Sequence, residues 1–186
     1  MTEHLCELPI HLFLDRIAAS TPAPGGGSVA AAAGAMGAAL LEMVASISLP
    51  KASDEIRPRL EAIRQQAHEL RNELCNLIDH DNLAYLGVVA AYKTPKDQPD
   101  RKDKIQEAMW EATDTPLGTL EACKKGVALA GELELIALKT AASDVNVGLS
   151  MLQAGAEGAR ENVLINLPSL KDEAKRAEAN RRLGDG

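Results

Sequence analysis

The sequence predicts an all-α, single-domain bundle of long helices. Of the 186 residues 46% are apolar, yet only 2% are aromatic. The apolar content is mostly Ala and Leu, which favour helix over strand. Neither a strand-like alternation of Val, Ile, Thr and Tyr nor an internal repeat or domain boundary is visible. Residues 1–186 are therefore interpreted as one domain.

Apolar residues recur at helical spacing along five segments, and a short charged helix is expected between Pro168 and Gly184. Polar loops rich in Pro separate the first helix from the second and the third from the fourth. Pro116 predicts a break or kink in the fourth helix. The five segments are 8–19, 29–49, 54–91, 101–138 and 143–167.

Charge and cysteine content narrow the class of function. The net charge of −7 and the pI of about 5.1 argue against a nucleic-acid binder that works through a basic surface. Cys6, Cys75 and Cys123 form no CxxC or Cys/His cluster, which predicts a reduced cytoplasmic protein without a structural metal. The acidic N-terminus lacks the pattern of a signal peptide.

Residues 29–49 resemble a membrane span, with Glu42 as their only charge. Their length suffices, but Ala and Gly dominate and the hydropathy is modest. We therefore expect a buried central helix and no membrane partner.

A glycine motif, Pro24, Gly25, Gly26, Gly27 and Ser28, leads directly into this helix. A helix N-terminus offers unpaired N–H groups and the positive end of the dipole, and glycines let a ligand approach. The motif therefore suits a carboxylate or phosphate. It is neither a Walker loop nor a dinucleotide fingerprint. The alternative is a tight turn in which Ser28 or a glycine caps the helix.

Small residues form a stripe on one face of each of two predicted helices. Glycine inside a helix costs about 1 kcal/mol relative to alanine, so its repeated use indicates close helix packing or a flat ligand. Close packing is the preferred interpretation, and it would place Asp144 and Asn162 beside the central helix. The stripes are Gly27, Ala30, Gly34, Gly37 and Leu41, and Asp144, Gly148, Met151, Gly155, Gly158 and Asn162.

Asp81 interrupts the apolar seam of the third helix, which runs from Ile56 to Val88. A buried carboxylate is costly unless it is paired or useful, and burial raises its pKa into a range that suits proton transfer. A structural ion pair is the alternative. The neighbouring Asp79 and His80 point to other faces and are expected in solvent.

Other polar residues have ordinary alternatives. Ser143 and Asp144 begin the fifth helix, where such a pair commonly forms an N-cap. Lys51, Lys93 and Lys96 lie in loops, where most lysines are solvated. The four histidines form neither a triad nor a metal-ligand spacing, so no metal site is predicted.

Seven blocks follow one another in order along nearly the whole chain: 21–28 with Met43, 77–81, 91–96, 104–108, 112–117, 143–144 and 162–166. Together they resemble the cyclodeaminase/cyclohydrolase family. That family comprises the C-terminal domain of formiminotransferase-cyclodeaminase and the stand-alone methenyltetrahydrofolate cyclohydrolases. The ordered set is more specific than the glycine motif alone.

The resemblance implies an all-α homodimer that binds folate near the glycine motif and needs no metal or redox cofactor. Two segments depart from the family pattern. Where members have Gly-Lys-Lys this chain has Pro50-Lys51-Ala52, and where they have Gly-Asn-x-Asn it has Ala137–Thr140. Substrate contacts are expected to differ there.

The implied reaction is hydrolysis of 5,10-methenyltetrahydrofolate to 10-formyltetrahydrofolate. A carboxylate can hold the cationic one-carbon bridge and take the proton of the attacking water. Asp144 is expected as the cation partner or base, with Asp81 as its orienting or proton-relay neighbour. Asn162 is expected to bond the pterin. The remaining substrate contacts, some for the glutamate tail, are expected from Pro24, Gly25, Gly26, Gly27, Ser28, Lys51, Lys96 and Ser143.

Three other functions stay open. A formiminotetrahydrofolate cyclodeaminase would use the same pocket and release ammonia, and the absence of a fused formiminotransferase domain favours the hydrolase over it. A non-catalytic folate-binding or helical interaction module would account for the missing lysine and asparagines. A membrane adaptor is a third, more remote alternative.

Overall fold

The computed structural model describes residues 4–184 and confirms the all-α prediction, with no strand among these residues. The long helices are α2 (Gly26–Ser48), α3 (Arg57–Lys93), α4 (Arg101–Ile136) and α5 (Ala142–Asn166). The short ones are α1 (Ile10–Ala18) and α6 (Glu173–Leu183). Single 3-10 turns are η1 (Leu5–Glu7), η2 (Leu49–Lys51), η3 (Lys139–Ala141) and η4 (Leu167–Ser169).

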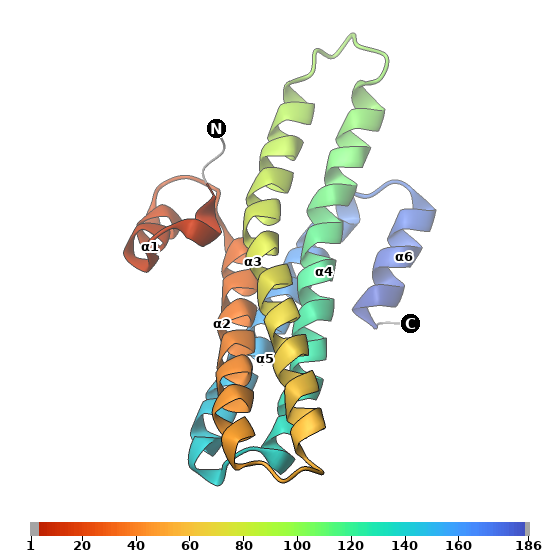
Figure 1. Ribbon diagram of the computed structural model, residues 1–186. Helices are drawn as coiled ribbons and strands as arrows, with labels where there is room; N and C mark the ends of the chain where they lie inside the picture. The colour runs from red at the N-terminus through yellow and green to blue at the C-terminus, as the bar shows by residue number, and fades with distance from the viewer. Residues whose placement is uncertain (1–3, 185–186) are drawn as a thin grey trace.

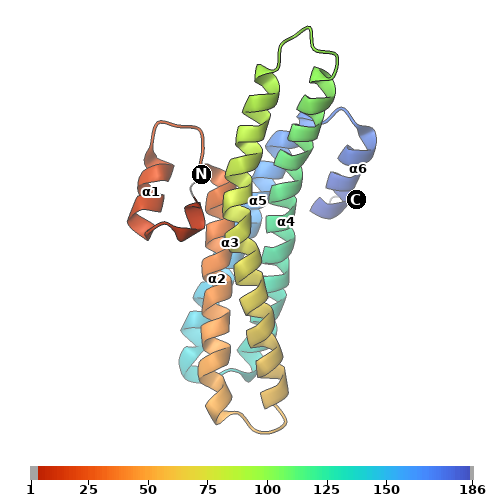
Figure 2. The same cartoon turned by 45° about the horizontal axis from the view of Figure 1, so that its top comes forward.

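The four long helices form an up-down-up-down bundle (Figure 1). α2 packs between α3 and α5, and α4 packs on the same two helices from the opposite side. α3 and α4 extend beyond the others as a hairpin, at the top of Figures 1 and 2. α1 lies outside the bundle beside α2, and α6 lies against α4.

The core is built mainly from aliphatic side chains. Leu41, Leu74, Leu133 and Leu152, one from each long helix, are fully buried in one cluster. Burying a leucine side chain completely contributes about 1.5–3 kcal/mol. The four leucines lie at helical spacing within their own segments, so the predicted amphipathic pattern accounts for the bundle.

α2 and α5 approach each other through their glycines. A Cβ atom added at Gly37 would lie 2.7 Å from the carbonyl oxygen of Gly148. One added at Gly155 would lie 2.8 Å from the carbonyl oxygen of Ala30 and 3.0 Å from the amide nitrogen of Gly34. No real Cβ atom fits at such distances, so the close-packing interpretation of the two stripes is confirmed.

The predicted break in the fourth helix is wrong, because α4 is continuous through Pro116. Proline cannot donate the N–H that would bond the carbonyl four residues earlier. That carbonyl belongs to Ala112, and the side-chain amide of Asn166 on α5 donates to it at 2.7 Å. A neighbouring helix therefore replaces the missing bond.

The segment Gly26–Lys51 is long and apolar enough to cross a membrane by length and composition, with 56% of its apolar window buried in the structure. Along its length α2 packs against α3 on one side and α5 on the other. That is the position of a core helix, as the sequence predicted.

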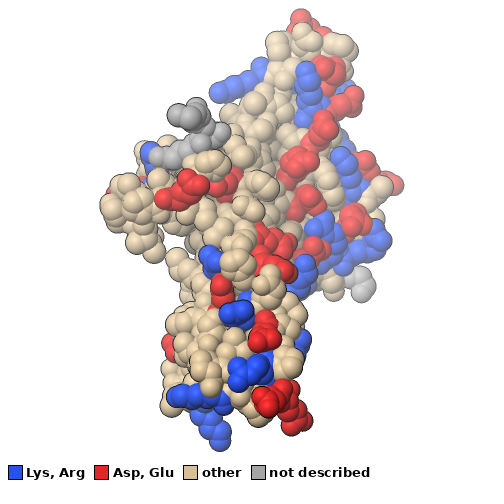
Figure 3. Space-filling model, viewed as in Figure 1, with Lys and Arg blue, Asp and Glu red and all other residues tan. Residues whose placement is uncertain are grey.

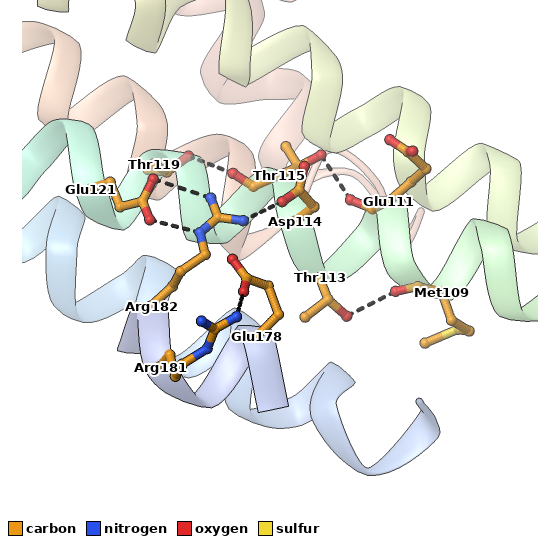
Figure 4. Close-up of polar contacts among 10 residues, drawn as sticks. All are labelled: Met109, Glu111, Thr113, Asp114, Thr115, Thr119, Glu121, Glu178, Arg181 and Arg182. Atoms are coloured by element: carbon orange, nitrogen blue, oxygen red, sulfur yellow. Dashed lines mark hydrogen bonds and ion pairs between the residues drawn. The ribbon is translucent and has the colours of Figure 1, made fainter. Parts of the chain in front are cut away.

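Arg182 makes the ion pairs that join α6 to α4 (Figure 4), beside the apolar contacts of Ala179 and Leu183. Arg182 donates to both carboxylate oxygens of Glu121, at 2.7 and 3.1 Å, and also to Asp114. These contacts lower the pKa of Glu121 chiefly through the hydrogen bond from Arg182. Such a bidentate pair fixes the orientation of the guanidinium as well as its position.

We predict opposite effects for two Gly→Ala substitutions. Alanine is the better helix former, by about 1 kcal/mol, so Gly131→Ala should stabilise the protein, because a Cβ there meets no atom within 4 Å. Gly155→Ala should destabilise it by about 1–3 kcal/mol, because its Cβ meets backbone of α2. Urea unfolding of both variants measures the difference. Equal effects would contradict the packing described.

We predict that Arg182→Gln loosens α6 while leaving the bundle folded. The lost ion pairs are partly exposed, so the global free energy of unfolding should fall by no more than about 1 kcal/mol. Trypsin should cleave within α6 several-fold faster in this variant than in the parent. Unchanged cleavage, with Arg181→Gln as the control, would show that Arg182 does not hold the helix.

Candidate active site

A polar pocket lies where the N-terminus of α2 meets α3, α4 and α5. Its volume is about 260 Å³. The α1–α2 connection and the first turn of α2 form one wall, and side chains from the other three helices form the rest. The lining residues are Pro22, Ala23, Gly25, Gly26, Gly27, Asp81, Tyr85, Val88, Met109, Ala112, Asn162 and Asn166.

The carboxylate of Asp81 sits directly on the first turn of α2. A Cβ atom added at Gly27 would lie 2.0 Å from Oδ1 of Asp81 and 2.5 Å from its Cγ. Only glycine at position 27 lets the carboxylate occupy this place. The hydroxyl of Ser28 lies 2.8 Å from Oδ2 of Asp81 and 3.2 Å from the carbonyl oxygen of Ile78. The pair joins α2 to α3 at the floor of the pocket.

Two opposing effects act on the Asp81 carboxyl. Burial raises its pKa above the usual 3.8, and hydrogen bonds from the hydroxyl and the backbone of Ser28 partly lower it again. The N-terminal end of α2 also favours the anion. With the rise prevailing, Asp81 holds a proton more readily than an exposed aspartate and can exchange it with a ligand in the pocket.

The predicted anion site is therefore filled by the chain itself. Gly25 is the N-cap of α2 and has no side chain to cap it, and Asp81 supplies a carboxylate to the same turn. Ser28 is fully buried and its hydroxyl bonds within the protein. Ser28 was expected to contact substrate, but its hydroxyl faces Asp81 and its side chain does not line the pocket.

Two asparagines one helical turn apart complete the polar lining. The side-chain amide of Asn162 donates to the carbonyl oxygen of Gly158 at 2.7 Å, and that of Asn166 donates to Ala112. These bonds fix the orientation of each side-chain amide, and its carbonyl oxygen can accept a hydrogen bond from a ligand. Asn162 was predicted from the sequence, and the structure places it in the pocket.

Tyr85 and Asn166 are pocket residues that the sequence analysis did not select. Tyr85 follows Asp81 by one turn of α3, and Asn166 follows Asn162 by one turn of α5. The i, i+4 spacing from an already selected residue was the signal that could have found both.

The structure separates Asp144 from Asp81, which corrects the predicted pairing of these two carboxylates within one chain. Gly27 marks the level of Asp81 on α2, and Gly37 marks the level of Gly148 on α5. The ten residues of α2 from Gly27 to Gly37 span about 15 Å along the bundle. Asp144 precedes Gly148 by one more turn of α5, so Asp81 and Asp144 are roughly 20 Å apart along the bundle axis. Helical periodicity places residues on faces but does not give their level along a bundle.

Four other predicted residues also lie outside the pocket. Pro24, between the lining residues Ala23 and Gly25, is buried and does not line it. Ser143 is in the first turn of α5 and Lys51 ends η2, so both lie at the far end of the bundle. Lys96 lies in the loop that joins α3 to α4. The N-cap interpretation of Ser143 and Asp144 is wrong as well, since α5 begins at Ala142 and its N-cap is Ala141.

Asp79 is not in solvent as expected. Its carboxylate accepts the backbone N–H of Leu5 at 2.5 Å and lies 3.2 Å from Nδ1 of His4. It thereby fixes the N-terminal segment on α3. The segment then leads through α1 to the connection that lines the pocket.

A larger cavity of about 640 Å³ lies between α3 and α4 in the projecting hairpin. It holds His80, Lys104, Glu107 and Glu111, but none of the residues predicted to act on substrate. We favour the smaller pocket because a buried carboxyl, two fixed amides and a phenol converge there. Among residues 4–184, no three His, Cys, Asp or Glu side chains are arranged to hold a metal ion.

Comparison with known proteins identifies the class to which this fold and site belong. The chain matches the Formiminotransferase-cyclodeaminase family model over residues 9–185, and it belongs to that family. The resemblance drawn from the sequence motifs is thereby confirmed.

Individual relatives differ in their reactions. The chain is 38% identical over 173 residues to the methenyltetrahydrofolate cyclohydrolase of Methylorubrum extorquens, covering 89% of this chain and 82% of that one. It is 33% identical to the formimidoyltransferase-cyclodeaminase of Sus scrofa, of which it spans only 34%. A solved structure of formiminotetrahydrofolate cyclodeaminase from Thermotoga maritima superposes with a TM-score of 0.88 at 30% identity, covering 96% of this chain and 88% of that chain.

We predict that the raised pKa of Asp81 gives a characteristic pH dependence of stability. The folded state binds this proton more tightly than the unfolded state, so the contribution of Asp81 falls as the pH rises from 3.8 through the folded pKa. The free energy of unfolding of the parent minus that of Asp81→Asn should therefore decrease over this window. An increase would mean that the pKa is depressed.

Proposed function

We propose that this protein is a methenyltetrahydrofolate cyclohydrolase, which converts 5,10-methenyltetrahydrofolate and water to 10-formyltetrahydrofolate. The observation that carries the proposal is the Asp81 carboxyl, seated on the first turn of α2 in a pocket lined by fixed amides. The relative from Methylorubrum extorquens, with which the chain shares most of its length, supports the choice of reaction.

The chemistry needs one group that exchanges a proton beside a cation. Water attacks the carbon that bridges two nitrogens, and the tetrahedral adduct breaks one carbon–nitrogen bond to leave the formyl group on the other nitrogen. One proton of the water moves to the expelled nitrogen, and the second leaves with the positive charge. An Asp81 anion stabilises the cation, and an Asp81 carboxyl with a raised pKa can carry the proton between the two steps.

The remaining pocket residues suit the ring end of the substrate. The carbonyl oxygens of Asn162 and Asn166 can accept N–H groups of the pterin, and Tyr85 adds a donor. A volume of about 260 Å³ is below the roughly 300–1,000 Å³ of pockets that enclose a drug-sized ligand. The benzoylglutamate tail therefore leaves the pocket, and Lys96 remains a candidate for its carboxylates.

The alternative is formiminotetrahydrofolate cyclodeaminase activity. It is favoured by the structural neighbour from Thermotoga maritima, which carries that name. The same Asp81 carboxyl would then protonate the departing ammonia. Both reactions share the pocket, so substrate turnover separates them.

We further propose a cytoplasmic homodimer that uses folate as substrate without a metal or redox cofactor, and without nucleic-acid or membrane partners. The acidic composition supports the exclusion of nucleic acid. The position of α2 between two helices supports the exclusion of a membrane.

We predict that the purified protein accelerates the loss of the near-ultraviolet absorbance of 5,10-methenyltetrahydrofolate and yields 10-formyltetrahydrofolate. Asp81→Asn should lower kcat about 10²–10⁴-fold, the usual contribution of a general acid–base group. Glu111→Gln, in the larger cavity, is the matched control and should retain parental kcat. Turnover of 5-formiminotetrahydrofolate alone would select the cyclodeaminase, and activity of Asp81→Asn equal to the parent would refute the role of Asp81.

A further inference from the structure

A proline lies inside α4 next to the wall of the pocket. Pro116 is buried, and the helix continues through it. Proline has no N–H for the carbonyl four residues earlier, and its ring crowds that carbonyl and pushes it away from the helix axis. The carbonyl in question belongs to Ala112, which lines the pocket. The proline therefore leaves a backbone acceptor that needs a donor on the pocket wall.

Asn166 on α5 supplies this donor. Its Nδ2 lies 2.7 Å from the carbonyl oxygen of Ala112. A backbone carbonyl can only accept a hydrogen bond, so only the NH2 end of the side-chain amide can face it. The carbonyl oxygen Oδ1 is then the end that remains for a ligand, and Asn166 also lines the pocket. Through Ala112, Pro116 thus determines which end of the amide is offered.

Other carbonyls near Pro116 receive additional bonds from within α4. Each of three threonine hydroxyls donates to the carbonyl four residues earlier, and the pairs are Thr113 to Met109, Thr115 to Glu111 and Thr119 to Thr115 (Figure 4). Such bonds stay inside one helix. The carbonyl of Ala112 is bonded from another helix instead. Pro116 therefore converts a contact within α4 into a contact between α4 and α5.

Neutral hydrogen bonds also hold the end of α5 at this level. The side chain of Gln106 on α4 donates to the carbonyl of Ser169 at 3.2 Å and accepts the backbone N–H of Lys171 at 2.7 Å. These bonds fix the turn that follows Asn166. Charged side chains gather instead over the surface of α4 and α6 (Figure 3). The position of Asn166 therefore depends on hydrogen bonds to α4 and not on ion pairs.

We propose that Pro116 is a positioning residue for substrate recognition. It frees the Ala112 carbonyl, this carbonyl orients the Asn166 amide, and Oδ1 of Asn166 accepts an N–H group of the substrate ring. The recognition step rests on the proposed cyclohydrolase function, whereas the coupling between Pro116 and Asn166 does not. With alanine at position 116, Ala112 would be bonded within α4, and the Asn166 amide could turn its NH2 group towards the ring.

The coupling can be tested by stability measurements without a ligand. At neutral pH, Asn166→Asp in the parent sets a carboxylate, which cannot donate, against the Ala112 carbonyl, so the urea midpoint should fall. In Pro116→Ala, the new N–H serves Ala112, and the same Asn166→Asp substitution should lower the midpoint by about half as much or less. The added charge is common to both backgrounds and cancels in the comparison. Equal decreases would overturn the coupling.

The orientation of the amide also has a spectroscopic signature. In proton–nitrogen correlation spectra, the side-chain NH2 of Asn166 should exchange with solvent about 10-fold faster in Pro116→Ala than in the parent, because its bond to Ala112 is lost. Asn162, whose amide bonds within its own helix, is the internal control. Pro58→Ala is the matched variant, since Pro58 lies in the first turn of α3 and replaces no helical bond. An unchanged exchange rate of Asn166 in Pro116→Ala would overturn the proposal.

The recognition step is tested by steady-state kinetics. Pro116→Ala should raise KM for 5,10-methenyltetrahydrofolate about 10-fold and change kcat by less than about two-fold, because Asn166 binds the ring equally in the ground and transition states. Pro58→Ala should keep the parental KM. The double variant Pro116→Ala/Asn166→Asp presents an acceptor in either orientation and should restore KM to within about three-fold of the parent.

Two outcomes would overturn the recognition step: an unchanged KM in Pro116→Ala, or a double variant whose KM is as high as that of Pro116→Ala. If the parent itself does not turn over the substrate, the proposed function fails and the recognition step fails with it. The stability and exchange measurements then still decide whether Pro116 orients Asn166.

Discussion

The contact between the Asp81 carboxylate and the first turn of α2 determines how the rest of the site is arranged. It places a chargeable group at the positive end of a helix and requires glycine at position 27, since any side chain there would collide with it. The Asp81 carboxylate also accepts the hydrogen bond that the Ser28 hydroxyl donates. The glycine motif thus serves the protein's own carboxylate, and the ligand meets that carboxylate in the pocket.

The glycine contacts between α2 and α5 determine which residues of α5 lie beside this turn of α2. With α2 and α5 in backbone contact, the end of α5 that carries Asn162 is brought against Gly26, where a Cβ would lie 3.2 Å from the amide nitrogen. The pocket is therefore a consequence of the way in which α2 and α5 pack.

Much of the fold could be predicted because helical periodicity and composition are local properties. The long helices, the glycine stripes and the position of Asp81 on the seam of α3 all follow from spacing. Tertiary features could not be obtained in this way. The continuity of α4 at Pro116 depends on Asn166 from another helix, and the distance between Asp81 and Asp144 depends on the level at which helices pair. Asp79 was expected in solvent because its partner, Leu5, is far away in sequence.

The most direct test of the account is to locate the folate on the protein. The backbone amide chemical shifts of an isotopically labelled sample should be recorded during addition of 5-formyltetrahydrofolate, a stable analogue of the substrate. The account predicts that the largest changes occur at Gly25, Gly26, Gly27 and Asn162, with Gly87 in the larger cavity unaffected. Changes concentrated at Gly87 and its neighbours, with the glycine motif unperturbed, would contradict it.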